Sequence, residues 1–285
     1  MRAPDAALAE AVEAALGRRP TAARPLPGGC IAEVLKLEFD AGEPVVVKRA
    51  PAGGLATEAY MLGLLGARSA LPVPQVLHDA DDLLIMTYVD GDSGLSAPAE
   101  ADAAAHVAAL HAVAGEAFGL ERDTLIGPLH QPNPQSERWI DFFRDHRLLY
   151  MAERARAAGN LSPQQHRAIE RLAGKLDAHL EEPPHPALLH GDLWGGNVLA
   201  RGDRIAGFVD PAVYYGHPEI ELAFSTLFGT FGRPFFERYA ELAELRPGFF
   251  EARRDLYNLY PLLVHATLFG GGYAAQAERI AGRFA

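Results

Sequence analysis

The chain has 285 residues, of which 49% are hydrophobic and 22% are charged, so it is long and apolar enough to form two globular domains. Its net charge of −11, without any block of Lys and Arg, argues against a nucleic-acid partner, because no basic cluster could displace the counterions of a phosphate backbone. The same negative charge favours a cationic substrate through long-range attraction.

Cys30 is the only cysteine, so no disulfide can form within one chain, and a reducing cytoplasm is the expected compartment. Residues 1–5 lack the apolar core of a signal peptide, and no apolar run approaches the roughly 18 residues of a membrane span. We therefore predict a soluble cytoplasmic protein without membrane contact. Oxidation could join Cys30 of two chains, which leaves a monomer and a redox-dependent dimer as alternatives.

The first predicted strands follow a glycine-rich turn. Residues 5–16 predict an amphipathic helix, and residues 30–37 and 45–48 alternate as strands do. Gly28 and Gly29 precede these strands, where backbone amides could approach phosphates, and Lys48 ends the second strand within reach of the same phosphates. The turn resembles the glycine-rich loop of kinases but lacks the full G-x-G-x-x-G, so an ordinary hairpin is the alternative.

Glu58 lies at the start of a predicted helix over residues 57–65, which has Leu and Met at helical spacing. If the strands before it form a nucleotide site, Glu58 is the expected partner of Lys48. The alternative is a solvated Glu that the helix dipole favours in a first turn.

Two further strands are predicted over residues 73–77 and 83–89, and Asp90 and Gly91 then mark a hinge. In a kinase, residues after such a strand bind adenine through backbone groups. By this interpretation Met86 faces the adenine pocket, and Thr87 and Val89 supply the backbone contacts. We predict a strand-rich domain over residues 1–89 and a second domain over residues 90–285.

The second domain is expected to be mainly helical. Helices are predicted over residues 99–114, 137–158, 163–180 and 253–268, with another after residue 217 and a short one at the end of the chain. Ser136 is a candidate N-cap for the second of these helices. Residues 115–134 are expected to form a loop, and a loop of this length in a compact domain is often functional.

A set of polar residues between two short apolar runs carries the chemistry. Asp192 follows His190 and precedes Asn197 by five residues, and Asp210 comes thirteen residues later, directly before Pro211. This spacing matches the kinase catalytic loop H-R-D-x-x-x-x-N and its later metal-binding Asp. In phosphoryl transfer from ATP, one carboxylate accepts the proton of the attacking hydroxyl, and two oxygen ligands hold magnesium. The alternative, a glycine-rich turn with an Asp cap, explains one Asp and not the set.

Residues 189–197 (LHGDLWGGN) and 209–223 (VDPAVYYGHPEIELA) closely resemble the fructosamine kinases, or ketosamine-3-kinases. These belong with the aminoglycoside phosphotransferases and choline kinases in the protein-kinase-like fold. The resemblance extends over most of the chain, from residues 28–31 to residues 269–273. Unlike protein kinases, the chain has no Arg before Asp192 and no phosphorylatable activation segment after Asp210.

This resemblance implies an α+β, bilobal protein-kinase-like fold, with a small strand-rich N-lobe and a larger, mainly helical C-lobe. It also implies transfer of the ATP γ-phosphoryl group to the 3-hydroxyl of a ketosamine, with ATP and Mg²⁺ bound. Asp192 would be the base, and Asn197 and Asp210 the metal ligands. Lys48, held by Glu58, would bind the α- and β-phosphates.

Three more residues are implied for the substrate pocket: Trp194, His217 and His265. For Trp194 the alternative is a ring in the core of the C-lobe. Glu221 is expected to brace the catalytic loop from the following helix.

The substrate could be a small-molecule ketosamine or a glycated protein lysine, and the sequence does not select the sugar. One rival interpretation is a kinase for another cationic alcohol, such as an aminoglycoside or choline. Another is a nucleotide-binding pseudokinase that serves as a scaffold.

Overall fold

The structure is a computed structural model that describes residues 3–26, 32–50 and 54–285. The predictions for Gly28, Gly29 and Cys30 fall outside these residues. In the described part of the chain, every helix is too short or too polar to cross a lipid bilayer.

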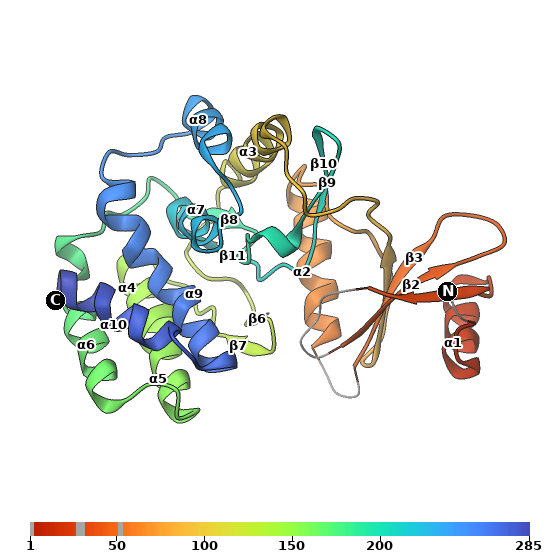
Figure 1. Ribbon diagram of the computed structural model, residues 1–285, viewed down its shortest axis with the longest axis horizontal. Coiled ribbons are helices and arrows are strands. Elements are labelled where there is room, and N and C mark those ends of the chain that lie inside the picture. Colours follow the sequence, from red (N-terminus) through yellow and green to blue (C-terminus); the bar gives the residue numbers. More distant parts are fainter. Residues whose placement is uncertain (1–2, 27–31, 51–53) are drawn as a thin grey trace.

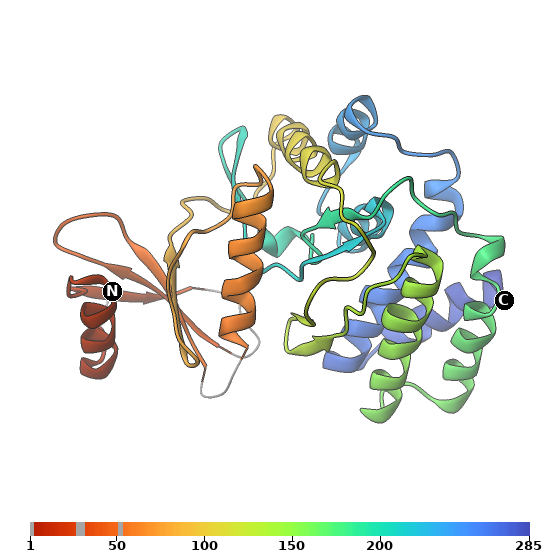
Figure 2. The same cartoon turned by 180° about the vertical axis from the view of Figure 1, so that it is seen from behind.

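The molecule has two lobes, a smaller one rich in strands and a larger one rich in helices, as predicted (Figure 1). Within the described residues, the N-lobe is a five-stranded antiparallel sheet of order β1-β2-β3-β5-β4. Helix α1 packs on one face, and α2 stands between the sheet and the C-lobe in both views (Figures 1 and 2). The elements of this lobe are α1 (Ala6–Leu16), β1 (Ala22–Pro25), β2 (Glu33–Glu38), β3 (Val45–Arg49), α2 (Leu55–Arg68), β4 (Val76–Asp79) and β5 (Leu83–Thr87).

The alternation of side chains along β3 decides where Lys48 points. Val45 and Val47 join the cluster under α1, so Val46 and Lys48 face the opposite side, toward α2 and the C-lobe. Met86 on β5 is paired with Val46 and lies on this same face. A strand of period two thus buries two valines and still directs one ammonium into the space between the lobes.

The C-lobe is built around one large apolar core, which also includes Met61 and Leu65 of α2. Its helices are α3 (Ala97–His111), α4 (Trp139–Phe143), α5 (Tyr150–Ala157), α6 (Pro163–Ala173), α7 (Pro218–Leu227), α8 (Arg233–Leu242), α9 (Arg254–Phe269) and α10 (Tyr273–Phe284). Three short antiparallel pairs lie among them: β6 (Thr124–Ile126) with β7 (Leu129–Gln131), β8 (Ala187–Leu189) with β11 (Tyr214–Gly216), and β9 (Val198–Arg201) with β10 (Arg204–Phe208).

The chain between the lobes is held against β9. The backbones of Asp92 and Ala200 exchange hydrogen bonds of 2.9 and 2.7 Å, and a Cβ on Gly91 would come within 2.8 Å of the Ala200 carbonyl oxygen. The Val89 side chain packs over Gly207 of β10. These contacts support a boundary between residues 89 and 90, which stays a prediction.

Several elements differ from the sequence prediction. Strand β1 and helix α8 were not predicted, and the expected loop over residues 115–134 contains the β6–β7 hairpin. The helix expected over residues 137–158 is interrupted by a π-helical turn, Arg144–Leu149, between α4 and α5. The hairpin has only three residues in each strand, too few for a clear alternation in the sequence.

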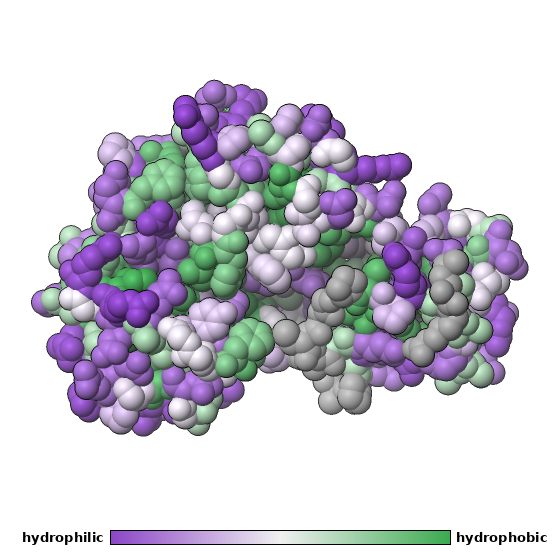
Figure 3. Space-filling view, viewed as in Figure 1, coloured by the Kyte–Doolittle hydropathy of each residue, from purple (hydrophilic) through white to green (hydrophobic). Residues whose placement is uncertain are grey.

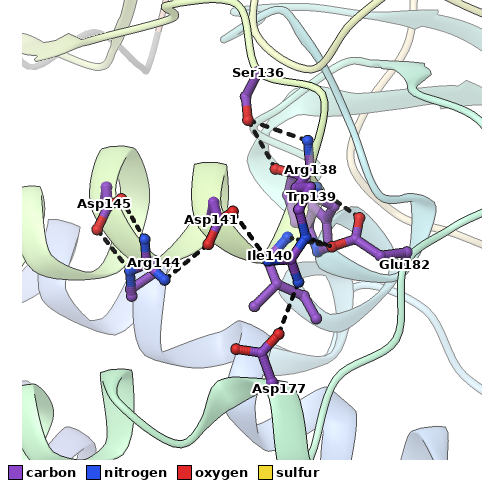
Figure 4. Close-up of polar contacts among 9 residues, drawn as sticks. All are labelled: Ser136, Arg138, Trp139, Ile140, Asp141, Arg144, Asp145, Asp177 and Glu182. Carbon is purple, nitrogen blue, oxygen red and sulfur yellow. Dashed lines mark hydrogen bonds and ion pairs between the residues drawn. The ribbon is translucent and has the colours of Figure 1, made fainter.

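The prediction that Ser136 caps the helix was wrong. Its hydroxyl instead forms a local turn with the backbone of Arg138 (Figure 4). The carboxylate of Glu182, which lies 43 residues further along, accepts from the backbone N–H groups of Trp139 and Ile140 at 2.7 and 3.2 Å. A cap supplied from so far along the chain leaves no local signal in the sequence.

Replacing Glu182 by Ala should lower the free energy of unfolding by about 0.5–2 kcal/mol, because the first N–H groups of α4 lose their acceptor. Urea unfolding measures this change. Glu181→Ala is the matched control, since Glu181 pairs with Arg246 at the surface and its loss should remove less than about 1 kcal/mol. Equal stability of the Glu182 variant and the wild type would contradict the capping assignment.

Candidate active site

The catalytic loop leaves the buried strand β8 through Gly191, a position that only glycine can occupy. Its φ is +86°, and a Cβ there would lie 1.9 Å from the carbonyl oxygen of Ala212. The Ala212 N–H also donates to the His190 carbonyl at 2.7 Å. The segment that carries Asp192 is therefore fixed against the segment that follows Asp210.

Glu221 of α7 braces this loop from below, as the sequence predicted. Its carboxylate accepts from the backbone N–H groups of Gly191 at 2.6 Å and His190 at 3.3 Å. The His111 ring lies 2.9 Å from the same carboxylate and 2.8 Å from the Tyr239 hydroxyl. Burial acts to raise the pKa of Glu221, but the hydrogen bonds from His111 and from the Gly191 backbone help to outweigh it and hold that pKa below its usual value.

Asp192, Asn197 and Asp210 meet where the two segments touch. The Asn197 amide donates to the Asp192 carboxylate and to the Asp192 carbonyl, both at 2.9 Å, and to the Asp210 carbonyl at 3.4 Å. Asp210 has a φ of +53°, a left-handed conformation that is strained for a residue with a side chain. The predicted Asp192–Asn197–Asp210 set is thus one contiguous cluster.

Lys48 joins the N-lobe to this cluster. Its ammonium lies 2.5 Å from the Glu58 carboxylate, so the predicted pair is present, and it also forms an ion pair with Asp210. Burial acts to lower the pKa of Lys48, but the charges of Glu58 and Asp210 outweigh it and raise that pKa above its usual value. Lys48 is therefore a fixed positive charge at neutral pH.

Asp192 has a different electrostatic environment. Burial, assisted by the nearby charge of Asp210 and opposed by the hydrogen bond from Asn197, raises the pKa of Asp192 to about 7. A carboxyl group with a pKa in this range can both accept and release a proton near neutral pH.

These residues line a cleft of about 210 Å³ between the lobes. Its walls come from α2, from the catalytic loop, from the segment after Asp210, and from the tip of the β6–β7 hairpin at Gly127 and Pro128. The cleft lining contains six of the predicted site residues: Lys48, Glu58, Asp192, Trp194, Asn197 and Asp210. A larger apolar hollow of about 570 Å³ between α8 and α9 contains none of them.

Trp194 lies at the cleft and not in the core. Its side chain is 40% exposed, and its ring meets Phe228 edge-on at 6.3 Å. His265 is half-buried on α9, where its ring packs on Phe228 at 4.8 Å. It therefore reaches the cleft only through other rings.

The structure does not bring His217 to the cleft. This side chain is buried, caps α7 by accepting from the Glu219 N–H at 3.0 Å, and packs against Tyr257. Burial and the charge of Arg253 lower the pKa of His217 to about 3, so the ring is neutral. We assign it a structural role because its acceptor nitrogen is already used by the helix.

The three residues expected at adenine do not line the described cleft. Met86 is buried in the cluster beneath α2, and Val89 packs over Gly207. The N–H of Thr87 donates to the Gln75 carbonyl at 2.9 Å, so this amide is already used within the N-lobe.

Sequence reasoning missed the residues that hold the segment after Asp210. Gln131 donates to the Ala212 carbonyl at 3.0 Å and accepts from the Tyr260 hydroxyl at 2.7 Å. Thr124 donates to the Val213 carbonyl at 3.2 Å. These partners lie about 80 to 130 residues apart and follow no motif, so a single sequence offers no signal for them.

A lysine held by a glutamate in a strand-rich lobe, facing an Asp–Asn–Asp cluster in a helical lobe, is the arrangement of ATP-dependent phosphotransferases with the protein-kinase-like fold. The profile of the fructosamine kinase family matches residues 4–284. The chain therefore belongs to the fructosamine kinase family, whose members transfer phosphate from ATP to an alcohol group.

Individual relatives agree with this assignment. The chain is 41% identical over 178 residues to a probable ketoamine kinase of Synechocystis, a match that covers 61% of this chain and 58% of the relative. It is 34% identical to a protein-ribulosamine 3-kinase of Arabidopsis thaliana, over 89% of this chain and 79% of the relative. A solved structure from Thermobifida fusca with a fructosamine-3-kinase assignment has a TM-score of 0.87 and 35% identity, over 98% of this chain and 100% of that one.

Replacing Glu221 by Gln should lower kcat at least tenfold and leave the KM for ATP unchanged, because an NH₂ group would face amides that need an acceptor. Steady-state kinetics measures both values. Glu219→Gln is the matched control, since Glu219 lies on the same helix, is equally buried, and pairs with Arg253 away from the loop. It should lower stability without lowering kcat. A similar fall in kcat in both variants would contradict the bracing role.

Proposed function

We propose that the protein is an ATP-dependent kinase that phosphorylates the 3-hydroxyl of ketosamines, the fructosamine or ribulosamine adducts of amines. Membership of the fructosamine kinase family supports the substrate class. The observation that carries the proposal is the position of Asp192, at the cleft, hydrogen-bonded to Asn197 and two residues before the exposed ring of Trp194.

Asp192 is the proposed general base. Its raised pKa, about 7, matches the task of taking a proton from a sugar hydroxyl as the new bond to phosphorus forms. A positioned base of this kind typically contributes about 10²–10⁴-fold in rate. Asn197 donates to one oxygen of this carboxylate, which supports a fixed orientation of Asp192 at the cleft.

Lys48 is the proposed ligand of the ATP α- and β-phosphates, held in place by Glu58. In the structure its ammonium also neutralises Asp210. Gly28 and Gly29 are proposed to cover the phosphates, and the chain near Met86, Thr87 and Val89 to bind adenine.

Asn197 and Asp210 are the proposed ligands of Mg²⁺. Both line the cleft and contact each other, and they offer amide and carboxylate oxygens, the hard ligands that this ion takes together with phosphate oxygens. When bound, the ion would neutralise the negative charge that develops on the transferred group.

The consequence for the substrate follows from its chemistry. A phosphate on C3 stands next to the C2 ketone, so it becomes a good leaving group once the sugar enolises. Loss of the phosphate makes the adduct unstable and frees the amine. The proposed activity is therefore the first step of deglycation, on a small-molecule ketosamine or a glycated protein lysine, and we place it in the reducing cytoplasm on the basis of the single Cys30.

The direct test is ATP consumption with ribulosamine, fructosamine, aminoglycoside and choline as acceptors. Turnover of the two ketosamines alone is the expected result. Turnover of an aminoglycoside or choline instead would favour a kinase for another cationic alcohol. Binding of ATP and Mg²⁺ in a thermal-shift assay without turnover of any acceptor would favour a pseudokinase scaffold.

Replacing Asp192 by Asn should reduce kcat at least a hundredfold and keep the affinity for ATP and Mg²⁺ within about threefold, because the base does not hold the metal. Asp210→Asn is the comparison, since it should weaken metal binding itself. An Asp192 variant that keeps more than about a tenth of the wild-type kcat would show that another group takes the proton.

A further inference from the structure

A continuous row of aromatic rings extends from the cleft across the C-lobe. We call it the aromatic strip and define it as Trp194, Phe228, His265, Phe269 and Tyr273. The ring centroids of Trp194 and Phe228 are 6.3 Å apart, and those of Phe228 and His265 are 4.8 Å apart. His265 in turn contacts Tyr273 at 5.2 Å and Phe269 at 5.7 Å. All of these are tilted or edge-on contacts, the arrangements that aromatic pairs favour.

The aromatic strip is unusually exposed for apolar side chains. Trp194, Phe228 and Phe269 are 40%, 42% and 57% exposed, and they make up half of the six large hydrophobic side chains at the surface of the described residues. Figure 3 shows apolar side chains reaching the surface over α9 and beside β7, next to the hollow between the lobes. A contiguous apolar patch at the surface is commonly a binding site, whereas single exposed residues need no explanation.

The two ends of the aromatic strip tie it to the active site. Trp194 lines the cleft two residues after the proposed base. At the other end, the close of α9 and the start of α10 lie beside the β6–β7 hairpin in both views (Figures 1 and 2). A Cβ on Gly127, at the tip of that hairpin and in the cleft lining, would stand 4.0 Å from Leu268 of α9. The strip is therefore continuous with the cleft.

His265 supplies a polar atom in the middle of the strip. Its Nδ1 lies 2.8 Å from the carbonyl oxygen of Pro261, which can only accept, so Nδ1 carries the hydrogen. Burial lowers the pKa of His265, which keeps the ring neutral. Its Nε2 then carries no hydrogen and can accept a hydrogen bond between the aromatic rings. Aromatic faces and a neutral acceptor together suit an ammonium group that carries an apolar chain.

We propose that the aromatic strip binds the amine-bearing half of the substrate, so that the enzyme prefers ketosamines whose amine carries an apolar or aromatic chain. This inference rests on the proposed function. The amine stands on C1 of the sugar, two carbons from the hydroxyl that Asp192 would deprotonate, so its chain leaves the cleft past Trp194. The ammonium then lies over the first rings of the strip, and the chain continues toward Phe269.

The test uses two ribulosamines that differ only in the amine, one made from glycine and one from phenethylamine. With the wild type, the KM for the phenethylamine adduct should be lower. Phe269→Ala should raise that KM about five- to tenfold and leave the KM for the glycine adduct and for ATP within about twofold, whereas Phe228→Ala, which removes a ring under the ammonium, should raise the KM for both adducts. Phe250→Ala is the matched control, because Phe250 is 43% exposed in the other hollow, away from the cleft, and its loss should change none of these values.

Two results would overturn the inference while the proposed function stands. One is equal KM values of the wild type for both adducts. The other is a Phe269 variant that raises both KM values alike. Failure of the wild type to phosphorylate either adduct would overturn the proposed function and the inference with it. A circular-dichroism melt of each variant verifies that the exposed rings were removed without unfolding the protein.

Discussion

The structure depends on an imbalance of charge in the cleft. Three carboxylates, those of Glu58, Asp192 and Asp210, line the cleft together with a single ammonium, that of Lys48. Lys48 forms ion pairs with Glu58 and Asp210, whereas burial, assisted by the charge of Asp210, raises the pKa of Asp192 to about 7. A site with this deficit attracts cations. A metal ion that accompanies ATP and an ammonium group on the substrate would both add positive charge to the cleft.

The surrounding fold keeps these charges in place with groups from distant parts of the chain. Gly191 lets the catalytic loop pass against Ala212, and Glu221 holds the loop from α7. On the other side, Gln131 fixes the segment after Asp210. Each bond satisfies a backbone group that would otherwise be buried alone, so the geometry of the cluster and the stability of the C-lobe depend on the same contacts.

The sequence predicted what is encoded locally. The spacing of Asp192 and Asn197 and the alternation that turns Lys48 toward α2 are properties of short segments, and both are present. Contacts between segments that are distant in the chain could not be predicted from the sequence. Glu182, and not Ser136, accepts from the first N–H groups of α4. His217 is buried because its ring caps α7 and so does not reach the cleft. The backbone N–H of Thr87, which we expected to bind adenine, instead donates to the Gln75 carbonyl.

The most direct measurement of the central claim is the position of the phosphate in the product. The enzyme is incubated with ATP, Mg²⁺ and a ribulosamine, and the product is examined by ³¹P–¹H correlation NMR before it decomposes. We expect a phosphate ester whose phosphorus couples to the proton on C3 of the sugar, and no such signal with Asp192→Asn. A phosphorus coupled to another sugar position, or only inorganic phosphate from ATP, would contradict it.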